Sequence, residues 1–308
     1  MARYATGGDF DACDNMLLVA LAQNQGLSIA KCTCLVYVNP QTLIFIYSMK
    51  ITVIGAGNMG GALVKGLAKK AGHQLTVTAR TEATLSRITA EYPEVQTSLN
   101  NVEAVKGVDI VVLAVKPWLV RSVIEEIKDS LDFERQVILS VAANVFTETL
   151  REYLGCPTAN VFYVMPNIAA EYNESMTFLA PANGVSPELT QRIEELLSLL
   201  GKVKVCMENE VAAGNMMSGC GIAYVFRFIH AMMEGGVEMG LYPAEAREIA
   251  MQAMKGAVAT LESSGMHPAV AIDKVTTPGG LTIKGLNELD HAGFNSAVIR
   301  CLKAGLAK

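Results

Sequence analysis

Residues 51–60 have the sequence ITVIGAGNMG, and this stretch decides the fold. Residues 51–54 form the short, mostly apolar run that is typical of a strand buried on both faces. Glycines follow at the G-x-G-x-x-G spacing, and after them the apolar residues recur at helical intervals. A glycine-rich turn alone is a weak signal, but between a buried strand and a helix it predicts a dinucleotide-binding unit.

Each glycine of this turn has its own expected role. Gly55 permits a tight turn, Gly57 lets the backbone approach a pyrophosphate, and Gly60 lets the helix pack closely on the strand. The free N–H groups and the dipole at the start of the helix attract phosphates. The expected cofactor-binding residues here are Gly55, Ala56, Gly57, Asn58 and Met59.

Strands and helices alternate from residue 50 to about residue 205. Further strands are expected at 75–79, 95–97, 110–115, 137–141 and 161–164, and helices at 58–70, after a capping Thr81 and from about Trp118. This alternation predicts a Rossmann-type, doubly wound parallel sheet with helices on both faces. Beyond it only helical patterns remain, at 210–218, 223–240, 243–264, 280–291 and 295–307. The expected fold class is therefore α/β, followed by an all-helical domain.

Three segments are expected along the chain. Residues 1–48 are predicted to be an extension outside the core fold, with Met49 as an alternative start, although residues 43–47 have the β propensity of an added edge strand. Residues 49–206 form the nucleotide-binding domain, and residues 207–308 form the helical domain. The helices of this second domain are apolar on more than one face, which predicts an intimate homodimer through it.

The end of the second strand indicates which dinucleotide is used. An NAD enzyme usually places an acidic residue there to bind the ribose 2′-hydroxyl, but this chain has Arg80 and Thr81. A guanidinium pairs with a 2′-phosphate, so NADPH is favoured and NADH is the alternative. Ligands of such sheets lie at the carboxyl ends of strands. We therefore also expect cofactor contacts from Ala114, Val115, Lys116, Pro117 and Ala142.

Composition excludes several other classes of function. The net charge is −5 and no basic stripe is present, which argues against nucleic acid as a partner. The sequence contains no apolar run of about 18 residues, so no membrane span is expected. Seven cysteines, an odd number without zinc-site spacing, are typical of unpaired thiols in a reducing cytoplasm. The four histidines form no motif with acidic residues, and no metal site is expected.

Seven short stretches together resemble one family. They are 54–59 (IGAGNM), 113–117 (LAVKP), 140–143 (SVAA), 165–167 (MPN), 218–221 (SGCG), 223–226 (AYVF) and 276–282 (TTPGGLT). In order and spacing they are similar to the pyrroline-5-carboxylate reductases, from Met49 nearly to the end of the chain. The last stretch is the most specific.

The resemblance implies a Rossmann domain followed by a helical dimerisation domain, in a homodimer or a ring of dimers. The implied reaction reduces the small molecule 1-pyrroline-5-carboxylate to L-proline, by hydride transfer from NADPH. The implied substrate-binding residues are Thr277, Gly279, Gly280 and Asn167, and Thr282 is the implied catalytic residue, hydrogen-bonded to the ring nitrogen. The physical alternative for Thr282 is a hydroxyl that caps a helix start.

Some positions depart from the family pattern. Ile168 and Ala169 stand where the family usually has Thr-Pro, Cys220 and Ile222 replace a serine and a proline, and Leu281 replaces a small or hydroxyl residue. The alternatives are therefore a reductase of a related imine or of a hydroxyacid, or a non-catalytic NADPH-binding regulator. A hydroxyacid reductase would need a lysine or histidine proton donor, and no motif supplies one. A sensor of the cofactor alone would not need the glycine loop at 276–282.

Overall fold

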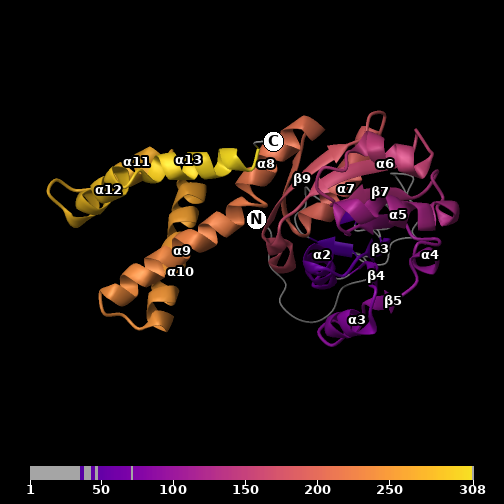
Figure 1. The fold of residues 1–308 in the computed structure, drawn as a ribbon, viewed down its shortest axis with the longest axis horizontal. Coiled ribbons are helices and arrows are strands. Elements are labelled where there is room, and N and C mark those ends of the chain that lie inside the picture. The colour runs from indigo at the N-terminus through magenta and orange to yellow at the C-terminus, as the bar shows by residue number, and fades with distance from the viewer. Residues whose placement is uncertain (1–34, 38–42, 46–47, 71, 307–308) are drawn as a thin grey trace, which may run out of the picture.

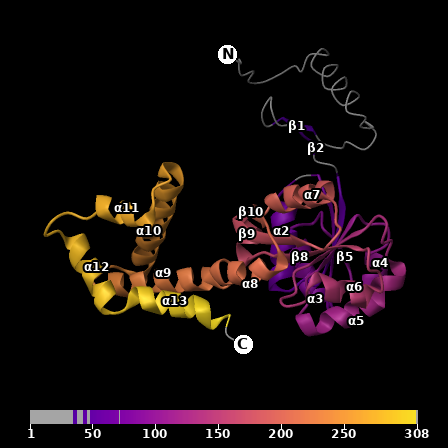
Figure 2. The same ribbon diagram turned by 90° about the horizontal axis from the view of Figure 1, so that it is seen from above.

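The computed structural model describes residues 35–37, 43–45, 48–70 and 72–306. They form an α/β domain with a long helical arm that extends away from it (Figure 1). The arm stands clear of the sheet in the perpendicular view as well (Figure 2).

The α/β domain is built on one eight-stranded sheet with the order β10-β9-β8-β7-β6-β3-β4-β5. Every neighbouring pair is parallel except β8 and β9. The strands are β3 (Lys50–Ile54), β4 (Gln74–Thr78), β5 (Gln96–Ser98), β6 (Ile110–Leu113), β7 (Val137–Ser140), β8 (Asn160–Met165), β9 (Ser175–Pro181) and β10 (Gly201–Val205). The chain builds β3, β4 and β5 outward in one direction and then crosses over to β6, as a doubly wound fold requires.

Helices cover both faces of the sheet, which confirms the predicted layers. On one face Leu63, Ile88 and Ile193 belong to a single apolar cluster, and on the other Val120 and Leu150 belong to a second. The helical segments of this domain are α2 (Asn58–Ala68), α3 (Glu82–Thr89), α4 (Asn101–Ala104), α5 (Pro117–Ile127), η2 (Lys128–Ser130), α6 (Thr147–Leu154), η3 (Ile168–Tyr172) and α7 (Pro187–Ser198).

The sheet is parallel, as predicted, except at one edge, where two strands follow residue 164 that the sequence patterns did not indicate. Strand β9 runs antiparallel to β8, and β10 pairs parallel with β9. Strand β9 was not predicted because Ser175 and Thr177 interrupt its apolar pattern. Both residues are nevertheless buried, and their hydroxyl oxygens lie 3.0 Å apart. Strand β10 carries the exposed Lys202 and Lys204 and lies at the sheet edge, so it lacks the apolar run of a central strand. Helices α6 and α7 were also not predicted.

Of the first 48 residues, the structure describes two short strands and Ser48. Strands β1 (Leu35–Tyr37) and β2 (Leu43–Phe45) pair antiparallel in a sheet of their own. Residues 43–45 therefore form a strand, as their β propensity indicates, but this strand pairs with β1 rather than with an edge of the main sheet. The remaining part of the predicted extension lies outside the described residues.

The arm consists of helices, and no strand occurs among its described residues, 208–306. They are α8 (Glu208–Met217), α9 (Gly221–Glu238), α10 (Pro243–Ser264), α11 (Pro268–Lys274), α12 (Leu281–His291) and α13 (Phe294–Ala304). Helix α11 was not predicted. Helix α8 attaches the arm to the sheet, because Val211 packs with Phe178 and Gly214 leaves room for the ring of Phe178.

The rest of the arm is strongly exposed. Within residues 208–306 only Val211, Gly221, Gly236, Ala246 and Ala250 are buried. The stretch Glu208–Glu238 is long and apolar enough to span a membrane by length and composition, and 6% of its apolar window is buried. One such stretch is weak support for a membrane span, because helices that pack in soluble proteins pass the same test. Large exposed apolar surfaces of this kind are typical of interaction sites.

Helix α2 approaches η3 so closely that Gly66 cannot carry a side chain. A Cβ atom there would lie 2.1 Å from the carbonyl oxygen of Ala170.

We expect Gly66→Ala to lower the free energy of unfolding by about 1–3 kcal/mol, because overpacking forces the two backbones apart. Urea unfolding measures this change. The matched control is Gly61→Ala in the same helix, where a Cβ meets nothing within 4 Å. It should stabilise the protein by up to about 1 kcal/mol through helix propensity. Equal effects of the two substitutions would contradict the packing argument.

Candidate cofactor and substrate site

The glycine-rich turn lies where the sheet changes direction. Strand β3 has β4 on one side and β6 on the other, and Ile54 is paired in register with Leu113. The chain continues from these two strands into α2 and α5, which lie on opposite faces (Figure 1). A crevice forms outside the carboxyl ends of strands at such a switch point, and it is where open α/β sheets bind ligands.

Close contacts explain two of the three motif glycines. Gly55 has a φ of +104°, and a Cβ there would lie 2.7 Å from the carbonyl oxygen of Ala114. At Gly60 a Cβ would lie 1.8 Å from the carbonyl oxygen of Gly55. Gly57 differs, because it is exposed and a Cβ would meet nothing within 4 Å. Its missing side chain leaves space for a ligand rather than for protein.

The start of α2 is free to receive an anion. Gly57 is the N-cap residue and supplies no side-chain hydrogen bond, and no acidic residue lies in the first turn. Asn58 is exposed and Met59 is half-buried beside it. An uncapped helix start with its N–H groups directed outward is a phosphate site. The turn therefore fits the pyrophosphate of a dinucleotide.

The other predicted cofactor residues reach the same sheet edge. Arg80 is exposed directly after β4. Thr81 takes the N-cap position of α3, but its hydroxyl lies 3.0 Å from that of Thr84 and caps no backbone group. Ala114 and Val115 form the turn after β6, which ends two residues earlier than predicted. Lys116 is the exposed N-cap of α5, Pro117 is its first residue, and Ala142 is buried after β7.

Sequence reasoning missed a polar chain that supports this edge. The buried Thr78 donates its hydroxyl to Oδ1 of Asn101 at 2.6 Å, and Nδ2 of Asn101 donates to Glu126 at 3.1 Å. These bonds join the end of β4 to α4 and α5. The available signal was a polar residue, Thr78, at the end of a strand whose positions alternate between polar and apolar.

Asn167, predicted to bind substrate, has a structural role in the single chain. It is buried, its side-chain oxygen accepts the N–H of Ala169 at 2.9 Å, and its own N–H donates to Ser175 at 3.1 Å. Asn167 thereby caps η3 and shapes the turn after β8. Its contact with substrate stays a prediction.

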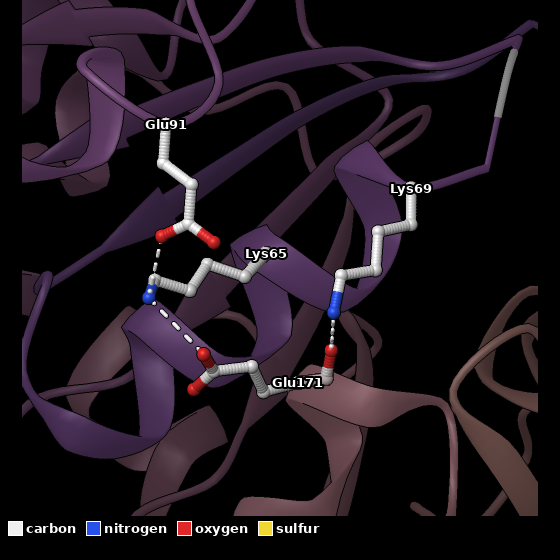
Figure 3. Close-up of polar contacts among 4 residues, drawn as sticks. All are labelled: Lys65, Lys69, Glu91 and Glu171. Atoms are coloured by element: carbon white, nitrogen blue, oxygen red, sulfur yellow. Dashed lines mark hydrogen bonds and ion pairs between the residues drawn. The ribbon is translucent and has the colours of Figure 1, made fainter.

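Ion pairs fix η3 against the dinucleotide helix (Figure 3). Lys65 of α2 lies 2.8 Å from a carboxylate oxygen of Glu91 and 3.1 Å from one of Glu171, and Lys69 donates to the carbonyl oxygen of Glu171. The hydrogen bond to Glu91 and then that to Glu171 raise the pKa of Lys65, so the ammonium stays charged. Asn173 adds a hydrogen bond of 3.0 Å to the carbonyl of Gly66. The cofactor helix and the turn at Asn167 are therefore held as one unit.

The predicted substrate loop is a tight turn that opens α12. The N–H of Gly280 donates to the carbonyl of Thr277 at 2.9 Å, and Gly279 has a φ of +71°. Gly280 is the N-cap of α12 and makes no side-chain capping bond. Thr282 is the second residue of α12 and is exposed. A glycine turn at an uncapped helix start is a site that favours a carboxylate.

The two parts of the predicted site do not meet within one chain. The loop between α11 and α12 lies at the distal part of the arm, whereas the turn between β3 and α2 lies in the α/β domain (Figures 1 and 2). Each chain thus carries the predicted cofactor residues and, far from them, the predicted substrate loop.

Comparison with known proteins places the chain in a family. Residues 208–308 match the model "Pyrroline-5-carboxylate reductase dimerisation", and residues 50–144 match "NADP oxidoreductase coenzyme F420-dependent". A solved structure of 1-pyrroline-5-carboxylate reductase from Streptococcus pyogenes is similar, with a TM-score of 0.73 and 29% identity over 84% of this chain and 98% of that one.

Two curated relatives extend the comparison. Pyrroline-5-carboxylate reductase 1 of Dictyostelium discoideum is 34% identical over 269 residues, 83% of this chain, which spans only 48% of that protein's length. The pyrroline-5-carboxylate reductase of Methanosarcina acetivorans is 36% identical over 261 residues, which is 82% of this chain and 95% of the relative. With this identity along nearly the whole length of such a relative, the chain belongs to the pyrroline-5-carboxylate reductase family.

Proposed function

We propose that this protein reduces 1-pyrroline-5-carboxylate to L-proline with NADPH. The observation that carries the proposal is the glycine turn at Thr277–Gly280, an uncapped carboxylate site in a chain that also holds a dinucleotide crevice. A protein that only sensed the cofactor would need the crevice but not this turn. The named relatives support the same reaction.

The crevice fits NADPH in three respects. The cradle at Gly55 and Gly60 admits no Cβ, Gly57 leaves open space at an uncapped helix start, and Arg80 is an exposed cation at the end of β4. When bound, NADPH supplies the hydride. The match of residues 50–144 to an NADP oxidoreductase model agrees with this choice of cofactor over NADH.

The chain's own residues bind and orient the substrate. The N–H groups and hydroxyl of the turn from Thr277 to Gly280 hold its carboxylate, assisted by the dipole of α12. Thr282, two residues beyond Gly280 in the first turn of α12, hydrogen-bonds the ring nitrogen through its hydroxyl. A protonated cyclic imine is already electrophilic at carbon, so the main demand on the protein is orientation at about 3–3.5 Å rather than strong acid–base catalysis.

We further propose that two subunits complete each site. The arm exposes apolar side chains on several helices and carries the carboxylate turn far from its own crevice. A homodimer, or a ring of dimers, buries that surface and brings one subunit's arm to the other subunit's α/β domain. The match of residues 208–308 to a dimerisation model supports this assembly.

We also propose a cytoplasmic location. The free thiols of Cys156, Cys206, Cys220 and Cys301 agree with it, because thiols stay reduced there.

A related cyclic imine is the second candidate substrate. Ile168 is 43% exposed directly after Asn167, and Leu281 is 86% exposed directly before Thr282. Both are apolar residues at positions where the family usually has small or hydroxyl-bearing ones. An NADPH oxidation assay with the five-membered imine and with its six-membered homologue distinguishes the two candidates.

The first prediction concerns the 2′-phosphate. We expect Arg80→Ala to weaken NADPH binding roughly 10- to 100-fold, since a hydrogen bond to a charged group contributes about 1.5–3 kcal/mol. NADH binding should be unchanged because NADH lacks this phosphate. Calorimetric titration of both cofactors measures the difference. Arg87→Ala, in the last turn of α3, the helix that follows Arg80, is the matched control and should change neither affinity. Equal affinity of the unaltered protein for NADH and NADPH would refute the assignment.

The second prediction concerns Thr282. Loss of a hydrogen bond in a dry site costs about 1–3 kcal/mol, so Thr282→Ala should lower kcat roughly 10- to 100-fold. NADPH affinity should not change, and Thr282→Ser should restore most of the rate because it keeps the hydroxyl. Thr158→Ala, an exposed threonine before β8, serves as the control. If the alanine and serine variants are equally slow, Thr282 is structural rather than catalytic.

The third prediction tests the shared site. Light scattering should show a dimer or a multiple of one. Gly57→Asp puts a carboxylate at the phosphate position without a clash, so this variant should fold but not bind cofactor. Dimers of this variant and dimers of Thr282→Ala should both be nearly inactive. When the two are unfolded and refolded together, about a quarter of the wild-type activity should return, because half of the dimers are mixed and each has one intact site. A site formed within one chain would recover nothing.

A further inference from the structure

The side chain of Trp118 is not part of the core of the α/β domain. It is the chain's single tryptophan, and it is 76% exposed at the second position of α5. The buried side chains of α5 are Val120, Ile124 and Ile127. At 3.6 residues per turn these three lie on one side of the helix and Trp118 lies on the opposite side. The indole is therefore not part of the core beneath α5.

The position of Trp118 is nevertheless closely defined. It follows Lys116 and Pro117 in the turn after β6, and that turn packs directly on the dinucleotide loop through Ala114. Helical side chains incline toward the N-terminus of their helix, so a residue of the first turn covers the segment that precedes the helix. The indole of Trp118 is thus directed to the crevice edge of the sheet rather than along the flank of the domain.

A second exposed apolar residue lies at the same edge. Leu99 directly follows β5 and is 52% exposed. Strand β5 pairs with β4, and the backbone of Ala79 bonds that of Ser98 at 3.4 Å, so Leu99 is next to the segment that carries Arg80. An arginine and two apolar side chains therefore surround the carboxyl ends of β4, β5 and β6.

We infer that the indole of Trp118 covers one face of the adenine ring of NADPH. The inference rests on the proposed function, in which Arg80 binds the phosphate on the adenosine ribose. Adenine is attached to the same ribose, so it must lie near Arg80, on the side of the crevice formed by β4, β5 and the turn after β6. Aromatic side chains stack on nucleotide bases, and an indole offers a large flat surface at small conformational cost.

Intrinsic fluorescence tests this contact directly, because the chain contains one tryptophan. Adenosine 2′,5′-bisphosphate, which has the adenine end of NADPH without nicotinamide, should quench and shift the emission of Trp118. Nicotinamide mononucleotide should leave it unchanged. The reverse result would overturn the inference, because it would place the indole at the nicotinamide end.

Substitutions measure how much the contact contributes. Trp118→Ala should weaken binding of the bisphosphate and of NADPH roughly 5- to 50-fold, the range expected for base–aromatic stacking. Trp118→Phe should retain most of the affinity, because a phenyl ring also stacks on a nucleotide base. Tyr242→Ala removes a similarly exposed aromatic side chain, 81% exposed on the arm, and should leave cofactor binding at the wild-type level.

Three further results would overturn the inference. The first is an unchanged affinity of Trp118→Ala for NADPH. The second is an indole emission that is already blue-shifted and shielded from acrylamide before cofactor is added, because another part of the assembly would then cover the ring. In both cases calorimetry that still shows NADPH binding would leave the proposed function intact. Absence of NADPH binding to the unaltered protein would reject both proposals together.

Discussion

The contact between the turn after β3 and the turn after β6 is the constraint on which the candidate site depends. Gly55 and Gly60 can carry no side chain because Ala114 and the backbone of Gly55 occupy the space. This close approach starts α2 at the switch point with its N–H groups uncapped. It also sets where Lys116 and Trp118 lie, since both follow Ala114 within a few residues. A side chain at either glycine would separate β3 from β6 and displace the proposed phosphate and adenine sites together.

A second set of contacts extends this rigidity to the opposite side of α2. Gly66 packs on the backbone of η3, and Lys65 is held between Glu91 and Glu171. The turn at Asn167 therefore keeps a fixed position relative to the dinucleotide loop. Exposed ion pairs are weak individually, but this one joins two elements that close packing already brings together. Orientation is the main demand of hydride transfer, so a fixed platform for the cofactor serves the proposed chemistry directly.

The arm, unlike the α/β domain, has almost no core of its own among the described residues of the single chain. Its attachment to the sheet is small, centred on Val211 and the space left by Gly214, and most of its apolar side chains remain in contact with solvent in the single chain. Burial of such a surface is the main favourable term in association, so in the proposed dimer a second copy both stabilises the arm and supplies the missing half of the site. Under that proposal activity depends on assembly, because the carboxylate turn of one subunit reaches a crevice only when the arm is packed against another subunit.

The sequence by itself determined the dinucleotide unit, the doubly wound layers and the all-helical second part. These depend on local patterns: a buried strand before G-x-G-x-x-G, apolar runs at Ile110 and Val137, and helical periodicity after residue 207. Only the tertiary structure decided the antiparallel β9, where Ser175 and Thr177 are polar yet buried because they bond each other. It also decided that Asn167 caps η3 and that Thr282 lies far from its own crevice. Local patterns report which face of an element is apolar, but partners of buried polar groups and distances between domains depend on residues far apart in the chain. For that reason the motifs indicated the chemistry and the domain that carries each group of residues, whereas only the tertiary structure decided how far apart the two groups lie within one chain.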